Sequence, residues 1–323
     1  VASDDDASLL VSGVLTADGT WNTSGESILV GNVLDGHSGT LKFTDASLQS
    51  GPLNVQRGTV EFKAASATTG DVTLNTTAGF LGGFTTAKLE DADWTVNGDL
   101  IIHPSGVLSL ENSDMVVTGA TSVNFGAGEG GVILVDANSS LTLEGPTSNS
   151  GTIELTGGMI DTADQKLTNS GTILTGDGAG LFALDGDLEQ TTDGTTLVNI
   201  GGTQLAGDFD KHSVFVVDDI DGDGDFGSLF LDGTLKVELL EVGGEPYAPA
   251  VGEKFSVVRA KQQFIGKFDE ELLDLPALDG GLTWEIHYEQ SVGSVEGIDV
   301  DTLELLLTAV RPDLEAKYFY NDA

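Results

Sequence analysis

The stretches Asn149-Ser150-Gly151-Thr152-Ile153 and Asn169-Ser170-Gly171-Thr172-Ile173 repeat one phrase at a distance of 20 residues. Looser copies stand earlier in the chain, at Ser38-Gly39-Thr40-Leu41, Arg57-Gly58-Thr59-Val60 and Ser105-Gly106-Val107-Leu108. A unit of this length is too short to bury an apolar face alone, so successive units must stack and share one core. The repeat therefore predicts that each unit is one coil of a β-solenoid.

Each copy of the phrase leads into a short run that alternates apolar and polar residues, as in Thr152-Ile153-Glu154-Leu155. Such alternation places the apolar side chains on one face of a strand. Glycine and asparagine at the phrase boundaries predict corners, because they adopt backbone conformations that other residues resist. The nearest approach to a helical pattern, at residues 269–274, is about one turn long. We therefore predict an all-β protein, a right-handed parallel β-helix with about 20 residues per coil and a β-rich C-terminal cap.

The composition of the 323 residues agrees with a narrow interior filled by aliphatic side chains and threonine, since aromatic residues make up only 7% of the chain. The repeat pattern indicates a parallel β-helix over residues 1–201. Strands lengthen in residues 202–311, which we predict to be a β-rich capping region. Residues 312–323 carry Tyr318, Phe319 and Tyr320. This last segment is either an extended arm that docks on a neighbouring molecule or the first strand of a following domain.

The charge of the chain is strongly negative, with 52 acidic and 13 basic residues and a formal net charge of −39. Phosphate recognition depends on clustered lysine and arginine, so this composition argues against binding to nucleic acid or to anionic lipid. A field of this size also opposes compaction, and we expect bound or screening cations such as Ca²⁺ to offset it. There are no cysteines, and no apolar run has the length needed to span a membrane. The composition favours an extracellular protein of a bacterial cell surface.

Six segments of the C-terminal region follow one another in a recognisable order: Leu188–Leu197, Gly201–Thr203, Leu231–Leu235, Pro249–Val258, Gly266–Phe268 and Leu275–Trp284. In this order they resemble the C-terminal part of bacterial autotransporter-like passenger and surface β-helix proteins. The resemblance covers roughly residues 186–310. It implies that this region caps the solenoid and assists its folding, and it implies nothing about a ligand.

One insertion, at residues 218–227, departs from that family pattern, and four of its aspartates are candidate metal ligands: Asp219, Asp221, Asp223 and Asp225. The first three, followed by Gly224, match the start of a calcium loop, in which alternate carboxylates converge on one cation. The twelfth position is Phe230 rather than a bidentate glutamate, so the end of the loop does not match. Two interpretations remain open, a loop-type Ca²⁺ site and an acidic surface loop without a ligand.

Other candidate motifs favour structural roles. The glycine-rich segment at residues 126–131 precedes a strand rather than a helix, so no helix N-terminus is available for a pyrophosphate. The four histidines show no metal-binding spacing, and we expect them at surfaces or strand ends; the three tryptophans are expected in the core or the cap. A polyuronate lyase needs basic residues to bind its polyanionic substrate, and residues 1–200 hold only five. Paired carboxylates for a glycosidase are uninformative in so acidic a chain.

The sequence thus favours a non-enzymatic extracellular protein that builds a surface layer, filament or matrix with the help of cations. Its expected partners are further copies of itself, in an oligomer or polymer, and cell-surface polysaccharide. Two alternatives stay open: an adhesin that binds surface carbohydrate, and a β-helix enzyme that degrades polysaccharide.

Overall fold

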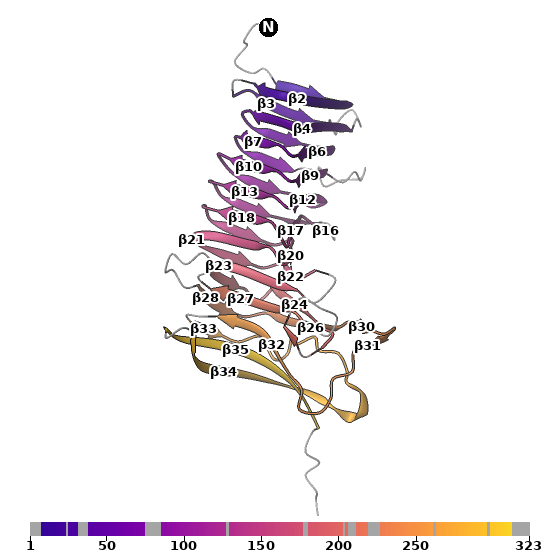
Figure 1. The fold of residues 1–323 in the computed structure, drawn as a ribbon, viewed down its shortest axis with the longest axis vertical. Coiled ribbons are helices and arrows are strands. Elements are labelled where there is room, and N and C mark those ends of the chain that lie inside the picture. The colour runs from indigo at the N-terminus through magenta and orange to yellow at the C-terminus, as the bar shows by residue number, and fades with distance from the viewer. Residues whose placement is uncertain are drawn as a thin grey trace, which may run out of the picture.

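The computed structural model of the protein describes residues 8–23, 25–31, 38–74, 85–126, 129–176, 180–202, 204–205, 211–218, 227–260, 263–295 and 298–311. These residues form strands and turns with one 3-10 turn, η1 (Asp279–Gly281), and no α-helix among them. The strands stack into a long rod with the first coil at one end and a long hairpin at the other (Figure 1).

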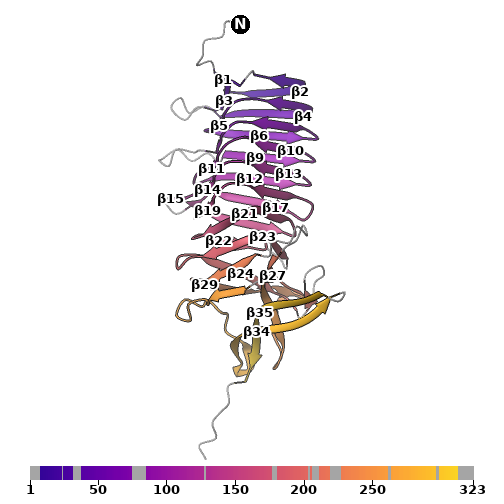
Figure 2. The ribbon, with the colours of Figure 1, turned by 90° about the vertical axis from the view of Figure 1, so that its left-hand side faces the viewer.

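Three parallel sheets run along the rod, here called faces A, B and C, and each circuit of the chain through them is one coil (Figure 2). Face A comprises the first parts of β2 (Val14–Asn22) and β4 (Gly39–Gln49), then β6 (Gly58–Lys63), β9 (Thr85–Glu90), β12 (Gly106–Glu111), β17 (Val132–Asp136), β20 (Thr152–Thr156), β22 (Thr172–Leu174), β24 (Thr195–Ile200) and β29 (Thr234–Leu239).

Face B follows face A in each coil. It comprises the second parts of β2 and β4, then β7 (Ser66–Thr69), β10 (Asp93–Val96), β13 (Asp114–Val117), β18 (Ser140–Leu143), the first parts of β21 (Met159–Asn169) and β23 (Leu181–Gln190), β27 (Val214–Asp218) and β32 (Lys254–Ala260).

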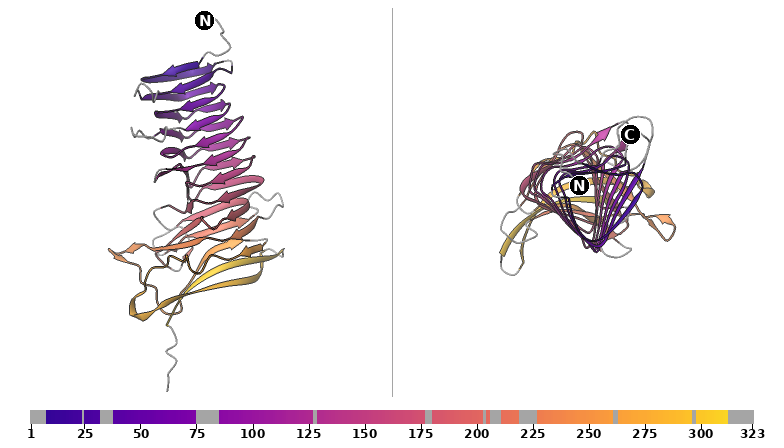
Figure 3. Two further views of the ribbon diagram at one scale, coloured as in Figure 1. Left: turned by 180° about the vertical axis from the view of Figure 1, so that it is seen from behind. Right: turned by 90° about the horizontal axis from the view of Figure 1, so that it is seen from above.

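Face C closes each coil. It comprises β1 (Ser8–Val11), β3 (Ser27–Val30), β5 (Leu53–Val55), β8 (Val72–Leu74), β11 (Leu100–Ile102), β14 (Thr121–Val123), β19 (Thr147–Asn149), the second parts of β21 and β23, β28 (Ser228–Leu231) and β33 (Gln263–Gly266). Seen along its axis, the rod has a roughly triangular outline (Figure 3). The predicted parallel β-helix is confirmed.

The glycines of the repeated phrase lie at the corner where face C leads into face A. A Cβ atom on Gly171 would lie against the backbone oxygen of Gly151 in the preceding coil, and one on Gly151 would meet the oxygen of Gly131 in the same way. Of the five phrase glycines only Gly58, with φ 126°, has a left-handed backbone. Our explanation of these glycines by special backbone conformation was therefore wrong for the other four. Close stacking of successive coils is what requires them.

Four of the six non-glycine residues with positive φ in the described chain lie at a different corner, between faces A and B. Asp45, Ala64, Asp91 and Asn112 have φ of 49°, 46°, 53° and 48° at equivalent positions in successive coils. Asparagine and aspartate tolerate this conformation better than most residues. Three polar residues and Ala64 therefore turn this corner with positive φ, whereas the corner before face A needs glycine for space.

Coil length varies through insertions at the corners. Thr152 pairs with Thr172, 20 residues later, but Gly58 pairs with Thr85, 27 residues later. In the long early coils the extra residues lie between face C and face A, after β3, β8 and β14. After β14 they include the antiparallel hairpin of β15 (Phe125–Gly126) and β16 (Glu129–Gly130). In the later coils they lie between faces A and B, after β22 and β24, and between faces B and C, after β27. The sheets keep their register because the additions are confined to the corners.

The interior is apolar over most of its length and contains a short aromatic stack near the first coils. The rings of Trp21, Phe43, Phe62 and Trp94 follow one another with centroid separations of 5.8, 5.3 and 5.1 Å. The indole nitrogen of Trp94 donates to the hydroxyl of Thr69 at 3.0 Å, which satisfies its one polar atom in the core. Aromatic ring pairs at these separations stabilise the fold by more than the burial of their apolar area alone.

A ladder of amide side chains replaces apolar residues inside face C. Asn149, Asn169 and Gln190 occupy one inward-facing register position in successive coils and are 1%, 0% and 2% exposed. The Asn149 amide donates to Asn169 at 2.7 Å, and the Asn169 amide donates to Gln190 at 3.1 Å. Gln190 in turn donates to the backbone oxygens of Gly194 and Thr234. Each amide thus bonds to the next, as buried polar groups require.

Parallel pairing continues past residue 201, into β27, β28, β29, β32 and β33, in a region where we expected capping structure rather than further coils. Antiparallel structure begins with β34 (Thr283–Val295) and β35 (Ile298–Val310), which form a long hairpin. β35 pairs antiparallel with β32 and ends face B. The division into domains at residue 201 stays a prediction. Short pairs complete the described strands: β25 (Gln204–Leu205) with β26 (Lys211–His212), and β30 (Glu241–Val242) with β31 (Glu245–Pro246).

Candidate functional site

The residues predicted to bind Ca²⁺, Asp219, Asp221, Asp223 and Asp225, lie outside the described residues, and so do Tyr318, Phe319 and Tyr320 of the predicted arm. The described chain does show where the acidic segment begins and ends. It leaves face B at the end of β27 and joins face C at Ser228, whose backbone N–H donates to the Asp187 carboxylate at 2.7 Å. The Ca²⁺ site and the arm stay predictions.

A column of aspartates leads up to the acidic segment and was missed in the sequence. Asp161 pairs in register with Asp185, and Asp185 pairs with Asp218, the last residue of β27. Asp161 and Asp185 lie on neighbouring strands of adjacent coils, whose backbones are about 4.8 Å apart. Asp185 is only 6% exposed. The signal in the sequence was an aspartate at the end of the face B part of the chain in three coils, which becomes visible only when the register is known.

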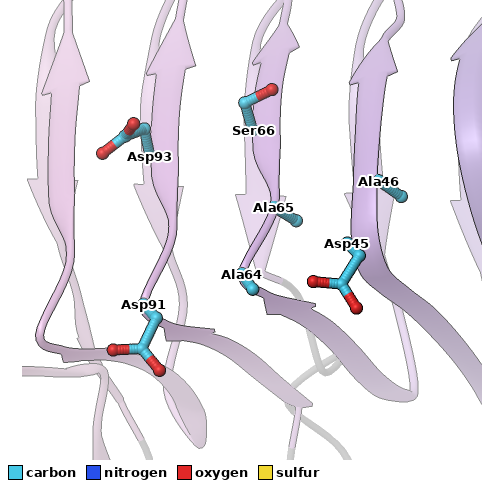
Figure 4. A pocket seen from close by; sticks show the side chains of 7 residues that line it. All are labelled: Asp45, Ala46, Ala64, Ala65, Ser66, Asp91 and Asp93. Carbon is cyan, nitrogen blue, oxygen red and sulfur yellow. The ribbon is translucent and has the colours of Figure 1, made fainter.

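A shallow groove of about 570 Å³ lies along the corner between faces A and B. Asp45 and Asp91 project from this corner on either side of Ala64, and Asp93 stands on the adjoining strand (Figure 4). Because the coil of Ala64 intervenes, the backbones at Asp45 and Asp91 lie two strand spacings apart, roughly 9 to 10 Å. Ca²⁺ binds its ligands at about 2.3 to 2.6 Å, so this separation does not suit a single ion held directly by both.

In the described part of the chain, no three histidine, aspartate or glutamate side chains are placed so that they could hold a metal ion together. The Asp91 carboxylate is already engaged, because it accepts a hydrogen bond from the side-chain amide of Asn112 in the next coil. The corner groove therefore presents acidic oxygens to the surroundings without forming a closed cation site of its own.

Asp136 is the one carboxylate near this corner with a resolved shift in pKa. Burial would raise the pKa of Asp136, but hydrogen bonds from the Ser139 hydroxyl and from the backbone N–H groups of Asn112 and Asn138 outweigh burial and hold the pKa below its usual value. The charged form is favoured when donors point at it. Asp136 thus joins the coil of Asn112 to its own coil as an ionised group.

The lysines of the first 200 residues are engaged on the flank of the rod. Each forms an ion pair with a glutamate of the following coil: Lys42 with Glu61, Lys63 with Glu90, Lys88 with Glu111 and Lys166 with Glu189. These side chains are 36% to 55% exposed, so the pairs contribute little to stability. Their main effect is on local charge, because the positive charge of each of these lysines is balanced by an acidic side chain beside it.

No described strand covers one side of the first coil. Three of its inward residues, Leu9, Leu15 and Trp21, are only partly buried, although Val11 and Ala17 are 4% and 1% exposed. The register partners of the first three in the next coil, Ile28, Leu41 and Leu48, are 0%, 0% and 3% exposed. Among the described strands, β1 pairs only with β3, and β2 only with β4. A Cβ atom on Gly13, which precedes face A as the phrase glycines do, would meet nothing within 4 Å. The described chain leaves apolar surface and two strand edges uncovered there.

Histidine and tryptophan lie as the sequence indicated where their side chains are described. Trp94 is in the core, and Trp284 is in the cap, where its ring lies 5.9 Å from that of Phe255 and its indole nitrogen donates to the Pro276 oxygen. His287 lies on β34 with its Nε2 atom 3.3 Å from the Glu285 carboxylate. The glycine-rich segment at 126–131 belongs to the β15–β16 hairpin and leads into a strand, as predicted.

No protein-family model matches the chain, and no curated protein matches it. Within the described residues, no helix has the length and hydrophobicity that a crossing of the bilayer requires. Any functional conclusion therefore depends on the geometry and charge of the rod itself.

Proposed function

We propose that the protein is a non-enzymatic structural component of an extracellular layer, filament or matrix, assembled end to end with the help of cations. The observation that carries this proposal is the side of the first coil that no described strand covers, where Leu9, Leu15 and Trp21 are partly exposed. An exposed strand edge is a template for pairing with another chain. The occupant that we propose for it is a second copy of this protein.

The opposite end of the rod offers a complementary strand. β34 pairs with β35 and with no other described strand, so its outer edge is also available. An edge at one end that pairs with a different edge at the other end is a heterologous contact, which produces open filaments rather than closed dimers. The two ends therefore favour a chain of molecules over a symmetric pair.

The charge of the protein explains why cations enter the proposal. Two copies that each carry a net charge of −39 repel one another, and this repulsion weakens as ionic strength rises. Divalent ions bound at acidic sites would lower it further. Cation-dependent assembly follows from the charge, and the acidic loop at 219–226 is the proposed Ca²⁺ site on each molecule.

Electron microscopy and sedimentation of the purified protein, with millimolar Ca²⁺ and with a chelator, test the proposal. Wild-type protein should form filaments with Ca²⁺ and disperse when the ion is removed. Gly13→Val should remain monomeric in both conditions, because the new side chain projects from the open side into the space that a second copy must occupy. Its thermal unfolding should match that of the wild type, since nothing described lies within 4 Å of the added Cβ atom.

Thr16→Val is the matched control, because it places the same side chain on the exposed flank of the same coil. This control should assemble like the wild type. A wild-type protein that stays monomeric at every Ca²⁺ concentration, or a Gly13→Val variant that still forms filaments, would contradict end-to-end assembly.

A further inference from the structure

A second groove lies on the flank of the rod, at the corner between faces C and A. It encloses about 270 Å³ and is lined by residues of four successive coils, among them Phe125, Ser150, Thr152, Thr172, Asp193 and Thr195. It lies in the middle of the rod, beside the β15–β16 hairpin, and well away from the first coil. Its chemistry is therefore independent of end-to-end assembly.

Phe125 forms one wall of this groove and is 61% exposed, the only exposed aromatic side chain among residues whose exposure is described. Its backbone is held in place, because the Phe125 N–H donates to the Ser150 hydroxyl at 3.1 Å and Gly131 N–H donates to the Asn124 oxygen at 2.7 Å. A single exposed apolar side chain is common on protein surfaces, but this ring is held on an anchored turn beside a polar groove. Its face is therefore available to stack against a flat face of a ligand.

A row of hydroxyl groups forms the floor of the groove. Thr152, Thr172 and Thr195 are in register on successive strands of face A, so the hydroxyls repeat at about 4.8 Å along the rod. Each side chain is half-buried, and the exposed Asp193 carboxylate lies at the far end of the row. Hydroxyls both donate and accept hydrogen bonds, and a carboxylate accepts them. The row can therefore match a ligand that carries many hydroxyls of its own.

The charge of the groove argues against an anionic ligand. No lysine, arginine or histidine is among its lining residues, Asp193 is acidic, and the chain as a whole carries −39. An anionic polymer would be repelled. An extended peptide is also disfavoured, because β20 and β22 are each paired on both sides and leave no strand edge for a peptide to join.

We propose that this groove binds a neutral polysaccharide, with one sugar ring stacked on Phe125 and the hydroxyls of neighbouring sugars bonded to the threonine row and to Asp193. The negative face of an aromatic ring attracts the C–H groups on the face of a sugar ring. A few polar groups at fixed positions then orient the chain, as in other ligand grooves.

Affinity electrophoresis and calorimetry with soluble neutral polysaccharides test this proposal, using laminarin, galactomannan and pullulan as probes and alginate as the anionic comparison. Wild-type protein should bind at least one neutral probe and should not bind alginate. Phe125→Ala should weaken that binding about tenfold or more. Thr172→Val, which keeps the shape and removes the hydroxyl, should weaken it less, and Asp193→Asn should leave part of the affinity because the amide oxygen still accepts hydrogen bonds.

Val251→Ala is the control, because Val251 is a comparably exposed apolar residue, 59% exposed, in the cap. It should bind like the wild type, and all variants should unfold at the wild-type temperature. Failure of the wild type to bind any neutral probe, undiminished binding by Phe125→Ala, or preferential binding of extended peptides would overturn the proposal. Gly13→Val should bind polysaccharide normally, so the result here is distinguishable from the test of assembly.

Discussion

Asn149 donates a side-chain hydrogen bond of 2.7 Å to the side-chain oxygen of Asn169, one coil further along the buried interior of the rod. The side-chain oxygen of Asn149 itself is buried and accepts no hydrogen bond. The residue in register with it in the preceding coil is Val123, which cannot donate. The ladder therefore ends at an acceptor without a donor, at the point where the apolar interior begins.

Val123→Thr should supply the missing donor. The new hydroxyl can bond to the Asn149 oxygen, so the substitution should change the free energy of unfolding little. Val55→Thr, at the same inward position between Val30 and Leu74, should destabilise by about 1 to 3 kcal/mol because its neighbours in the adjacent coils are apolar. Denaturant unfolding of the two variants measures the difference. Equal losses would show that the hydroxyl does not reach Asn149.

Gly171→Ala should destabilise the protein by about 1 to 3 kcal/mol or more, because the added methyl group would overlap the backbone oxygen of Gly151 and force the coils apart. Gly13→Ala is the matched control at the equivalent corner of the first coil, where the Cβ atom meets nothing within 4 Å. It should be neutral or slightly stabilising. Thermal unfolding of both variants provides the comparison, and similar midpoints would contradict the explanation by close stacking.

Ala64→Asn should stabilise the protein by about 1 kcal/mol, since asparagine tolerates the left-handed conformation that Ala64 adopts with φ 46°. The new amide would also lie beside Asp45, as the Asn112 amide lies beside Asp91 and donates to it.

Ala64→Asp tests the second part of that reasoning. It keeps a residue suited to the backbone but places a third carboxylate between Asp45 and Asp91 at about 4.8 Å per coil. Its midpoint of unfolding should fall below that of Ala64→Asn without divalent ions and rise when Ca²⁺ is added. If Ca²⁺ affected both variants equally, the corner groove would not concentrate cations.

Asp136 should make stability depend on pH in the acid range. Its pKa in the folded protein is lowered by hydrogen bonds from Ser139, Asn112 and Asn138 despite burial. A lowered pKa contributes stability that is present above the unfolded value, about 3.9, and is lost as pH falls through the folded value. Wild-type protein should therefore exceed Asp136→Asn in stability at pH 7, with the gap closing below about pH 4. Denaturant unfolding of both proteins across the acid range measures the gap, and a gap that does not change with pH would contradict this role of Asp136.

The acidic loop gives the direct test of Ca²⁺ binding. Asp221→Asn together with Asp223→Asn should abolish the calorimetric signal of Ca²⁺ binding, since each replaces a charged oxygen ligand with a neutral amide. Asp299→Asn together with Asp301→Asn changes the net charge equally in the terminal hairpin and should leave the signal intact. Identical titrations for both pairs would favour an acidic surface loop without a ligand.

The class of fold was accessible from the sequence because the phrase around Gly151 and Gly171 recurs at the length of one coil, and the alternation that follows it gives one buried face per strand. The amide ladder was only half visible. Asn149 and Asn169 belong to the quoted phrase, but Gln190 stands in no phrase, and its alignment with them depends on a register that the sequence does not display. The aspartates at 161 and 185 and the neighbours of Phe125 were hidden for the same reason, since 20 or more residues separate side chains that end up one strand spacing apart.

The sequence by itself determined that this chain is an acidic, stacked β-coil protein, because repetition, alternation and charge are properties of the linear order of residues. Only the tertiary structure decided why the glycines are needed, which side chains form columns, and where the rod is open or grooved. Those features arise from contacts between successive coils, and variable insertions at the corners shift the sequence spacing from coil to coil while the strand spacing stays constant.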